Sequence, residues 1–112
     1  MPGARWKSFG HAANGLWRLL REPNAKIHLI ATLVVLAVGF AKKLNRTEWC
    51  IIIIVISIVW ITEAINTAIE KLCDLYSTSF HPLIKQIKDV AAAAVFLAAI
   101  ATAIVGFIIF FF

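Results

Sequence analysis

The sequence predicts an all-α integral membrane protein: one amphipathic surface helix followed by three transmembrane helices, in a single domain over residues 1–112. Hydrophobic residues make up 62% of the chain, whereas about 45–50% is usual in soluble domains. A chain of 112 residues is too short to bury that much apolar surface in a core of its own. Charged residues are nearly absent from three long stretches and gather between them, as is typical of membrane-spanning helices.

The surface helix is expected over about residues 5–21. Its apolar residues recur at three- and four-residue spacings, and basic residues lie on either side of this stripe. Tryptophan and basic side chains favour the level of the lipid headgroups, so we expect the helix to lie in the membrane interface. A soluble helix packed on a core is the alternative, which the lack of a soluble core disfavours. The stripe consists of Trp6, Phe9, Ala13, Leu16, Trp17 and Leu20.

The three spans are expected at about residues 24–41, 49–70 and 88–112. Pro23 and Pro82 favour helix starts, because proline is well tolerated in the first turn of a helix. Thr47 is a candidate N-cap for the middle helix, whose helical pattern continues past its apolar part to Tyr76. The first stretch, of about 18 residues, is at the lower end of the length that crosses the hydrocarbon core of a bilayer, and the third is the clearest span.

The distribution of lysine and arginine predicts the orientation of the chain. Five of these residues precede the apolar stretch that begins at Ile27, three lie in the loop after it, and three lie between the second and third apolar stretches. The positive-inside rule therefore places the N-terminus and the second loop in the cytoplasm and the C-terminus outside. The net charge of the chain is +5. Its basic residues flank the spans, which favours anionic lipid headgroups over nucleic acid as a partner.

One face of the middle helix carries polar residues along the segment EAINTAIEKLCD, residues 63–74. At about 100° per residue, four of its side chains fall within a sector of roughly 80°, namely Glu63, Asn66, Glu70 and Asp74. This polar stripe spans about 16 Å at the helical rise. An acid at the bilayer centre costs on the order of 3 kcal/mol, and neighbouring carboxylates repel one another. A bound cation relieves both penalties, so the stripe predicts a cation-binding site.

Magnesium suits such a face, since it binds one or two carboxylates together with substrate phosphate oxygens and water. A carboxylate that does not bind the metal is able to act as general base on a substrate hydroxyl. Glu22, at the start of the first span, reaches the same depth. The start of the third helix supplies lysines, which would neutralise the charge of a transferring phosphoryl group. The side chains on that face of the third helix are His81, Lys85, Lys88 and Asp89.

Other interpretations remain open from the residues alone. Asp74 and Glu70 fit a solvated helix face or surface ion pairs, whereas Glu63 and Asn66 have no basic residue within contact range on their own helix. Intramembrane acids also suit an ion- or proton-coupled membrane protein, and a non-catalytic assembly subunit would need none of this chemistry. The chain has no glycine-rich phosphate loop and no protein-kinase catalytic motif. The residues by themselves therefore predict a membrane protein with a buried, metal-binding acidic site.

Three segments form a specific combination of motifs. E-A-I-N-T-A-I-E-x-x-x-D runs from Glu63 to Asp74, and K-D-V-A-A-A-A-V runs from Lys88 to Val95. Upstream, residues 22–29 read E-P-N-A-K-I-H-L. Together these segments resemble the signature of the prokaryotic diacylglycerol kinase family, which includes the undecaprenol kinases of Gram-positive bacteria. The resemblance covers nearly the whole chain.

The resemblance implies an ATP- and Mg²⁺-dependent lipid kinase of the bacterial cytoplasmic membrane. It also implies a homotrimer, with active sites shared between neighbouring subunits at the cytoplasmic face of the membrane. Diacylglycerol, which would give phosphatidic acid, is the acceptor expected first, and undecaprenol is the alternative. Neither an ion-coupled protein nor an assembly subunit requires the combination of Asn66 with Lys88 and Asp89, so the kinase interpretation is favoured.

By resemblance, Glu63 is the catalytic base that takes the proton of the lipid hydroxyl, and Glu22 and Glu70 bind the metal. His11 stands where some family members have an aromatic residue in the surface helix, and Ala92 replaces a small hydroxyl residue of some diacylglycerol-specific members. The residues expected to contact the lipid are Glu63, Ala92 and Trp17. The residues expected to contact the nucleotide are Arg5, His11, Glu22, Asn66, Glu70, Asp74, His81, Lys88 and Asp89.

Overall fold

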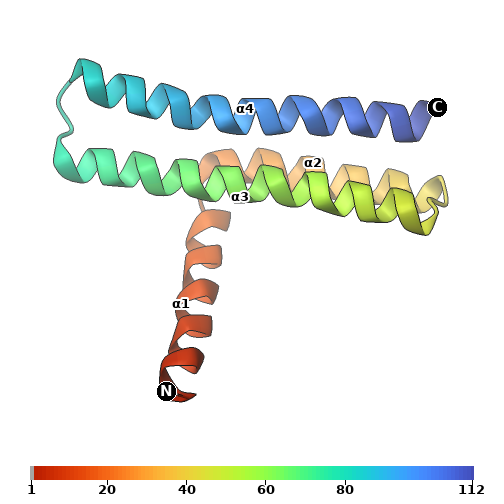
Figure 1. The fold of residues 1–112 in the computed structure, drawn as a ribbon, viewed down its shortest axis with the longest axis horizontal. Helices are drawn as coiled ribbons and strands as arrows, with labels where there is room; N and C mark the ends of the chain where they lie inside the picture. Colours follow the sequence, from red (N-terminus) through yellow and green to blue (C-terminus); the bar gives the residue numbers. More distant parts are fainter. Residues whose placement is uncertain (1) are drawn as a thin grey trace.

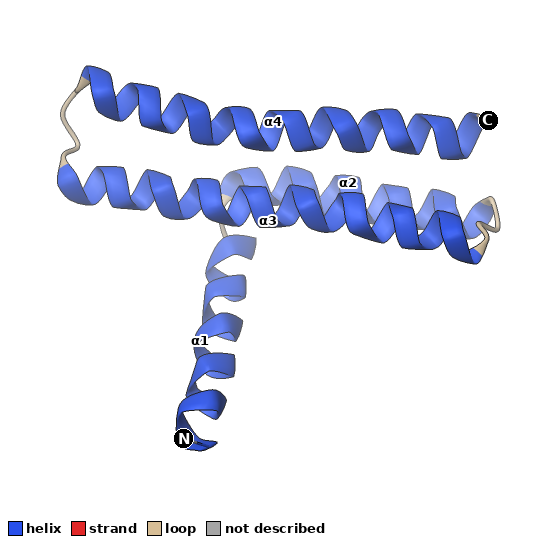
Figure 2. Ribbon diagram, viewed as in Figure 1, coloured by secondary structure: helices blue, strands red, loops and turns tan. Residues whose placement is uncertain are grey.

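Four helices make up the fold, and no strand occurs among the residues that the structure describes (Figure 2). The computed structural model describes residues 2–112, with side chains from residue 5 onward, so Met1 of the predicted domain lies outside it. The predicted all-α class is confirmed. The helices are α1 (Pro2–Leu20), α2 (Pro23–Ala41), α3 (Arg46–Tyr76) and α4 (Pro82–Phe111).

Helices α3 and α4 lie side by side and antiparallel, α2 runs alongside α3, and α1 projects from this bundle at a steep angle (Figure 1). Helices α2, α3 and α4 contain 19, 31 and 30 residues, and each is long and apolar enough to cross a membrane. The prediction of three such helices is confirmed. At the helical rise α3 is about 46 Å long, against about 30 Å of hydrocarbon. Part of α3 must therefore extend beyond the hydrocarbon or tilt within it.

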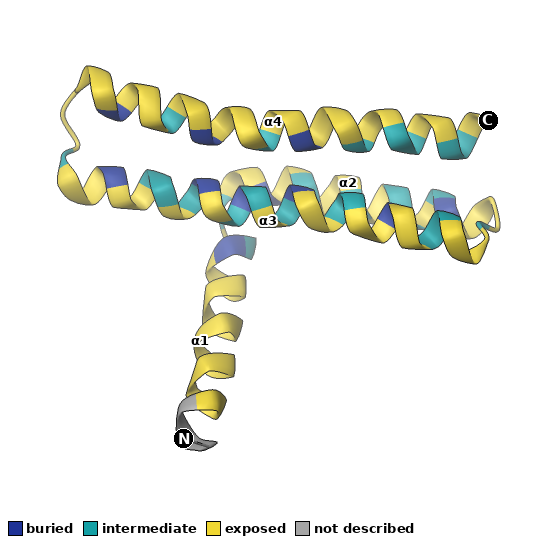
Figure 3. Cartoon of the chain, in the orientation of Figure 1, coloured by how far each residue is buried: buried dark blue, intermediate teal, exposed yellow. Residues whose placement is uncertain are grey.

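Most apolar side chains of the bundle face outward (Figure 3). In the most apolar 18-residue segments of α2, α3 and α4, only 11%, 22% and 6% of the segment is buried inside the chain. Hydrocarbon solvates such a surface, whereas water does not. On α1, Trp6, Phe9 and Trp17 are also 77%, 72% and 63% exposed. Within the described part of the chain, no other helix covers these aromatic side chains.

The helix ends are set by capping residues. His81 caps α4, because its Nδ1 accepts a hydrogen bond from the Leu83 N–H at 3.2 Å. The prediction of Thr47 as the N-cap of the middle helix is wrong, since Asn45 occupies that position. Asn45 Oδ1 accepts from the Glu48 N–H at 2.8 Å, and a Glu48 carboxylate oxygen accepts from the Asn45 N–H at 3.0 Å. Asparagine is the stronger N-cap of the two residue types, and the glutamate completes a capping box.

The interface between α3 and α4 follows a seven-residue repeat on both helices. A repeat of seven keeps the same face of each helix against its partner as the two wind slightly around each other. Alanine at two of the α4 positions allows close approach of the backbones, as small residues do in membrane helix pairs. The Thr102 hydroxyl adds a hydrogen bond to the Val55 carbonyl at 3.1 Å. The buried positions of the repeat are Ile52, Val59, Asn66 and Cys73 on α3 and Ile84, Ala91 and Ala98 on α4.

Helix α2 approaches α3 closely near the loop that joins them. A Cβ atom added at the buried Gly39 would lie 2.8 Å from Cη2 of Trp49. The Trp49 ring in turn contacts Phe40, with ring centroids 4.9 Å apart. At the same end of the bundle, Lys42 Nζ donates to the Phe110 carbonyl at 2.6 Å. This contact satisfies one of the carbonyl groups that the C-terminus of α4 leaves without a helical partner.

Gly39→Ala is expected to be less stable than Gly106→Ala. Each change gains about 1 kcal/mol of helix propensity, but the first places a methyl group 2.8 Å from Trp49, whereas the nearest side-chain atom at Gly106 lies at 3.9 Å. Overpacking should lower the unfolding free energy of Gly39→Ala by about 1–3 kcal/mol relative to Gly106→Ala. Unfolding of both variants in detergent micelles measures this difference, and equal stabilities would contradict the close packing of α2 on α3.

Candidate active site

The polar stripe predicted on the middle helix lies on the C-terminal half of α3, close to the starts of α2 and α4 (Figure 1). Glu63 and Asn66 are buried, with 3% and 4% of their surfaces exposed. Glu70 is half-buried and Asp74 is exposed. The stripe thus runs from the interior of the bundle to its surface.

Glu63 is paired with a histidine of another helix. Its Oε2 lies 3.1 Å from Nε2 of His28 on α2, and the two side chains are only 3% and 17% exposed. Its other oxygen, Oε1, lies 3.4 Å from the Thr67 hydroxyl one turn along α3, which is a long and weak hydrogen bond. The predicted catalytic base is therefore a buried carboxylate with one oxygen firmly engaged and the other nearly free.

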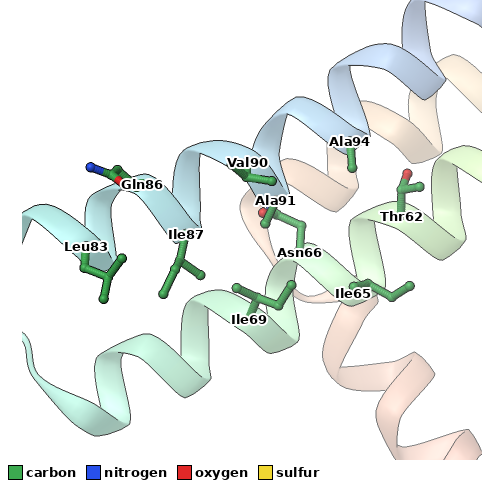
Figure 4. Close-up of a pocket in the computed structure, with 10 residues that line it drawn as sticks. All are labelled: Thr62, Ile65, Asn66, Ile69, Leu83, Gln86, Ile87, Val90, Ala91 and Ala94. Carbon is green, nitrogen blue, oxygen red and sulfur yellow. The ribbon is translucent and has the colours of Figure 1, made fainter.

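Asn66 connects Glu70 with a cavity between α3 and α4. Its Nδ2 donates to Glu70 Oε1 at 3.1 Å, and its Oδ1 is buried with no hydrogen-bond partner among the described residues. An unpaired buried carbonyl costs about 1–3 kcal/mol, so this oxygen is ready to accept a bond from a ligand. The cavity has a volume of about 530 Å³, and apart from Asn66 its lining is mostly apolar, including Ile65, Ile69, Leu83, Ile87 and Val90 (Figure 4).

Glu22 stands at the N-cap position of α2. Its Oε1 lies 3.0 Å from Nζ of Lys71 on α3. Since Lys71 directly follows Glu70, this ion pair brings the start of α2 to the surface end of the polar stripe. Both partners are accessible to solvent, with side chains 31% and 65% exposed. An exposed pair of this kind is weak, so a phosphate group or a cation is able to displace it.

Two ion pairs engage the charged residues at the start of α4. Lys88 Nζ donates to Asp74 Oδ1 at 2.7 Å and joins α4 to α3, while Lys85 Nζ donates to Asp89 Oδ2 at 2.7 Å within α4. All four side chains are at least a third exposed. His81 lies beside them and acts as the cap of α4. Asp74 therefore forms a surface ion pair, which is the alternative that the sequence left open for this residue.

The structure does not bring the other predicted residues to the polar stripe. Arg5 and His11 are exposed on α1, whose N-terminal half points away from the bundle (Figure 1), and neither forms a hydrogen bond or ion pair within residues 5–112. Trp17 on α1 and Ala92 on α4 are exposed as well. The C-terminal half of α1 faces α3 across a cavity of about 460 Å³ that reaches Lys71.

Sequence reasoning missed His28, Thr67 and Lys71 as residues of the site. His28 carries a usable signal, because an ionisable residue inside an apolar span is a functional candidate by default. The expectation that Glu63 has no basic neighbour holds along α3 but is wrong in three dimensions, since α2 supplies an imidazole at 3.1 Å.

Glu22 and two residues of the polar stripe carry donor atoms of the kind that magnesium prefers. Within residues 2–112, no three His, Cys, Asp or Glu side chains gather into a group that would hold a metal by themselves. Magnesium needs fewer, since one or two carboxylates suffice when phosphate and water complete its shell. Glu22 and Glu70 would supply carboxylates, and the unpaired Oδ1 of Asn66 would supply an amide oxygen. This set suits a metal that arrives with a phosphate ligand.

Comparison with known proteins identifies similar chains. The family model described as Prokaryotic diacylglycerol kinase matches residues 10–110, which include α2, α3 and nearly all of α4. An undecaprenol kinase of Bacillus subtilis is 42% identical over 94% of this chain and 86% of its own length. A diacylglycerol kinase of Synechocystis sp. is 36% identical over 88% of this chain and 58% of its own length. A diacylglycerol kinase of Helicobacter pylori is 38% identical over 80% of this chain and 70% of its own length.

Asn66→Leu is expected to stabilise the fold. The change removes the buried, unpaired Oδ1, and the half-buried Glu70 that loses its hydrogen bond is still reached by solvent. Unfolding in detergent micelles should show a gain of about 1 kcal/mol. Asn24→Leu is the matched control, because Asn24 is exposed and its amide can be solvated. A loss of stability in Asn66→Leu but not in Asn24→Leu would mean that Oδ1 has a partner in the folded protein.

Proposed function

The chain belongs to the prokaryotic diacylglycerol kinase family, and on this premise we propose that the polar stripe of α3 transfers the γ-phosphoryl group of ATP to the hydroxyl of a membrane lipid. As a member of this family the chain is a diacylglycerol or undecaprenol kinase. The observation that carries the proposal is the buried carboxylate of Glu63, 3% exposed, with one oxygen nearly free. The match over residues 10–110 supports the kinase interpretation over the ion-coupled and non-catalytic alternatives.

In the proposed reaction, Glu63 Oε1 accepts the proton of the lipid hydroxyl as the lipid oxygen bonds to the γ-phosphorus. The bond between that phosphorus and the bridging oxygen breaks, and ADP leaves. The place of Glu63 inside a bundle of apolar helices supports this role. A lipid would bring its hydroxyl to such a site from the membrane, and exclusion of water would protect ATP from hydrolysis at the same carboxylate.

We propose that Glu22, Glu70 and Asn66 hold Mg²⁺ together with the nucleotide phosphates. When bound, the ion would neutralise the negative charge that develops on the phosphoryl group during transfer. Lys71, which pairs with Glu22 at 3.0 Å, offers a second cation beside the same phosphates. The residues at the adjoining ends of α3 and α4 would contact the rest of the nucleotide, namely Asp74, His81, Lys88 and Asp89.

A homotrimer with shared active sites is also proposed, on the family resemblance. The direction of α1 supports it, because the N-terminal half of this helix, which carries the exposed Arg5 and His11, points away from the bundle (Figure 1). Both residues would contact the nucleotide if α1 of one subunit reached the polar stripe of its neighbour. Trp17 and Ala92, exposed on α1 and α4, would then contact the lipid.

The three apolar helices and the family suggest a bacterial membrane protein. We propose that residues 1–112 form one kinase domain, with α1 as a surface helix in the membrane interface. The N-terminus and the loop between α3 and α4 would lie in the cytoplasm, where ATP is available, and the C-terminus outside. This orientation follows from the distribution of lysine and arginine.

Two acceptors remain as candidates. Diacylglycerol is the acceptor expected first from the family resemblance, and two of the relatives compared above are named diacylglycerol kinases. The relative that is 42% identical over 94% of this chain is named an undecaprenol kinase, which favours the polyprenol. Both lipids present a primary hydroxyl on an apolar body, so the same base would serve either.

Purified protein in mixed micelles is expected to label one of these lipids from γ-labelled ATP. Glu63→Gln should lower kcat by about 100- to 10,000-fold, the usual contribution of a general base, while nucleotide binding persists. Glu48→Gln is the matched control, because glutamine also completes a capping box, and it should keep full activity. Substantial turnover by Glu63→Gln would exclude Glu63 as the base, and absence of labelling in folded wild-type protein would exclude the kinase reaction.

Glu70→Gln should raise the Mg²⁺ concentration needed for half-maximal activity. Loss of one of two carboxylates weakens binding of a hard cation, so partial recovery is expected as Mg²⁺ increases. The measurement is the rate of lipid phosphorylation at fixed ATP over a Mg²⁺ titration, with Glu48→Gln again as control. An unchanged Mg²⁺ dependence would rule Glu70 out as a metal ligand.

A further inference from the structure

Glu63 is held by a residue that the proposed mechanism does not yet use. His28 Nε2 lies 3.1 Å from Glu63 Oε2 and joins α2 to α3 inside the bundle. We propose that His28 is a positioning residue for phosphoryl transfer: it holds Glu63 Oε2 and so keeps Oε1 directed at the hydroxyl of the acceptor lipid. This inference rests on the proposed role of Glu63 as the base.

The contact with His28 suits the form of Glu63 that acts as a base. A base carboxylate is ionised and has only acceptor sites, so in that form the imidazole donates from Nε2 to Oε2. A charged carboxylate as deeply buried as Glu63 is strongly disfavoured without a donor, and within residues 5–112 no lysine or arginine forms an ion pair with it. The imidazole therefore offsets part of the desolvation of the charge that a base has to carry.

Thr32 and Trp60 surround His28, and of the two only the Trp60 ring touches the imidazole itself. The Thr32 hydroxyl donates to the His28 carbonyl at 2.7 Å, and Trp60 Nε1 donates to the Thr32 hydroxyl at 2.9 Å. The Trp60 ring also meets the His28 ring edge-on, with centroids 6.1 Å apart. Because Trp60 and Glu63 lie one turn apart on α3, this network ties His28 to the same turn that carries the base. Such rigid support is what keeps a reacting group in productive geometry.

The two oxygens of Glu63 are unequal as a result. Oε2 has His28 at 3.1 Å, whereas Oε1 has only the Thr67 hydroxyl at 3.4 Å. Without His28 the carboxylate is free to turn about its terminal torsion, which has a broad energy profile. Loss of His28 should therefore slow the transfer step without weakening nucleotide binding, because the charged residues at the ends of α3 and α4 are untouched.

The test compares three variants in the lipid phosphorylation assay. His28→Leu removes the donor and should lower kcat by about 100-fold while KM for ATP stays within about twofold, as expected of a misplaced catalytic group. His28→Gln places an N–H at a similar reach and should remain within about tenfold of wild-type kcat, since the hydrogen bond is restored. Thr32→Val breaks the Trp60 hydrogen bond but keeps the imidazole, so its kcat should fall less than that of His28→Leu.

Each alternative outcome has a distinct meaning. Wild-type kcat in folded His28→Leu, or equal losses in His28→Leu and His28→Gln, would overturn the positioning role. A loss in Thr32→Val as large as in His28→Leu would assign the effect to packing of α2 on α3 and would overturn it too. If His28→Leu does not fold, His28→Asn replaces it, because the shorter amide cannot reach Glu63 and the same loss is expected. Failure of the proposed function differs from all of these, since Glu63→Gln would then stay active or wild-type protein would label neither lipid.

Discussion

A carboxylate buried among apolar helices has to find a partner on another helix, and the arrangement of this chain depends on that constraint. Hydrocarbon offers no hydrogen bonds, so an unpaired charge within it is strongly disfavoured. Glu63 finds its partner in His28 of α2 at 3.1 Å, and the hydrogen bond from Trp60 to Thr32, 2.9 Å long, joins the same helices one turn away. Apolar surfaces alone give membrane helices little preference for one packing over another. Polar contacts of this kind therefore specify how α2 sits on α3.

Helix α4 is held against α3 mainly by the close packing of their side chains. Its buried alanines follow a seven-residue repeat that matches the repeat of α3. Asn66 is the one polar residue among the buried positions of this repeat, and its Oδ1 has no hydrogen-bond partner among the described residues. Departures of this kind from the rules of stable packing are typical of functional sites. Beyond the interface, the pair of Lys88 and Asp74 is exposed and free to rearrange. The site thus combines a rigid interior around the base with an adaptable rim suited to a nucleotide.

Helix α1 is the least constrained part of the fold. Its aromatic side chains are more than half exposed, and only its C-terminal half faces α3, across a cavity. A membrane surface would cover such side chains, because tryptophan and basic residues favour the headgroup region. A neighbouring subunit would in addition bring Arg5 and His11 to a polar stripe. The proposed surface helix and the proposed trimer together therefore account for the exposed aromatic and basic residues of α1.

By itself, the sequence determined the helical class, the three apolar helices, and the polar face shared by Glu63, Asn66, Glu70 and Asp74, because these depend on local composition and the helical period. Its motifs also identified the family, which the match over residues 10–110 bears out. The tertiary structure alone decided which partner each polar residue has. His28 lies 35 residues from Glu63 along the chain, and Lys71 meets Glu22 across two helices. The reason is that contacts between helices depend on how each helix is rotated about its axis and how the axes cross, which the packing of all side chains sets together.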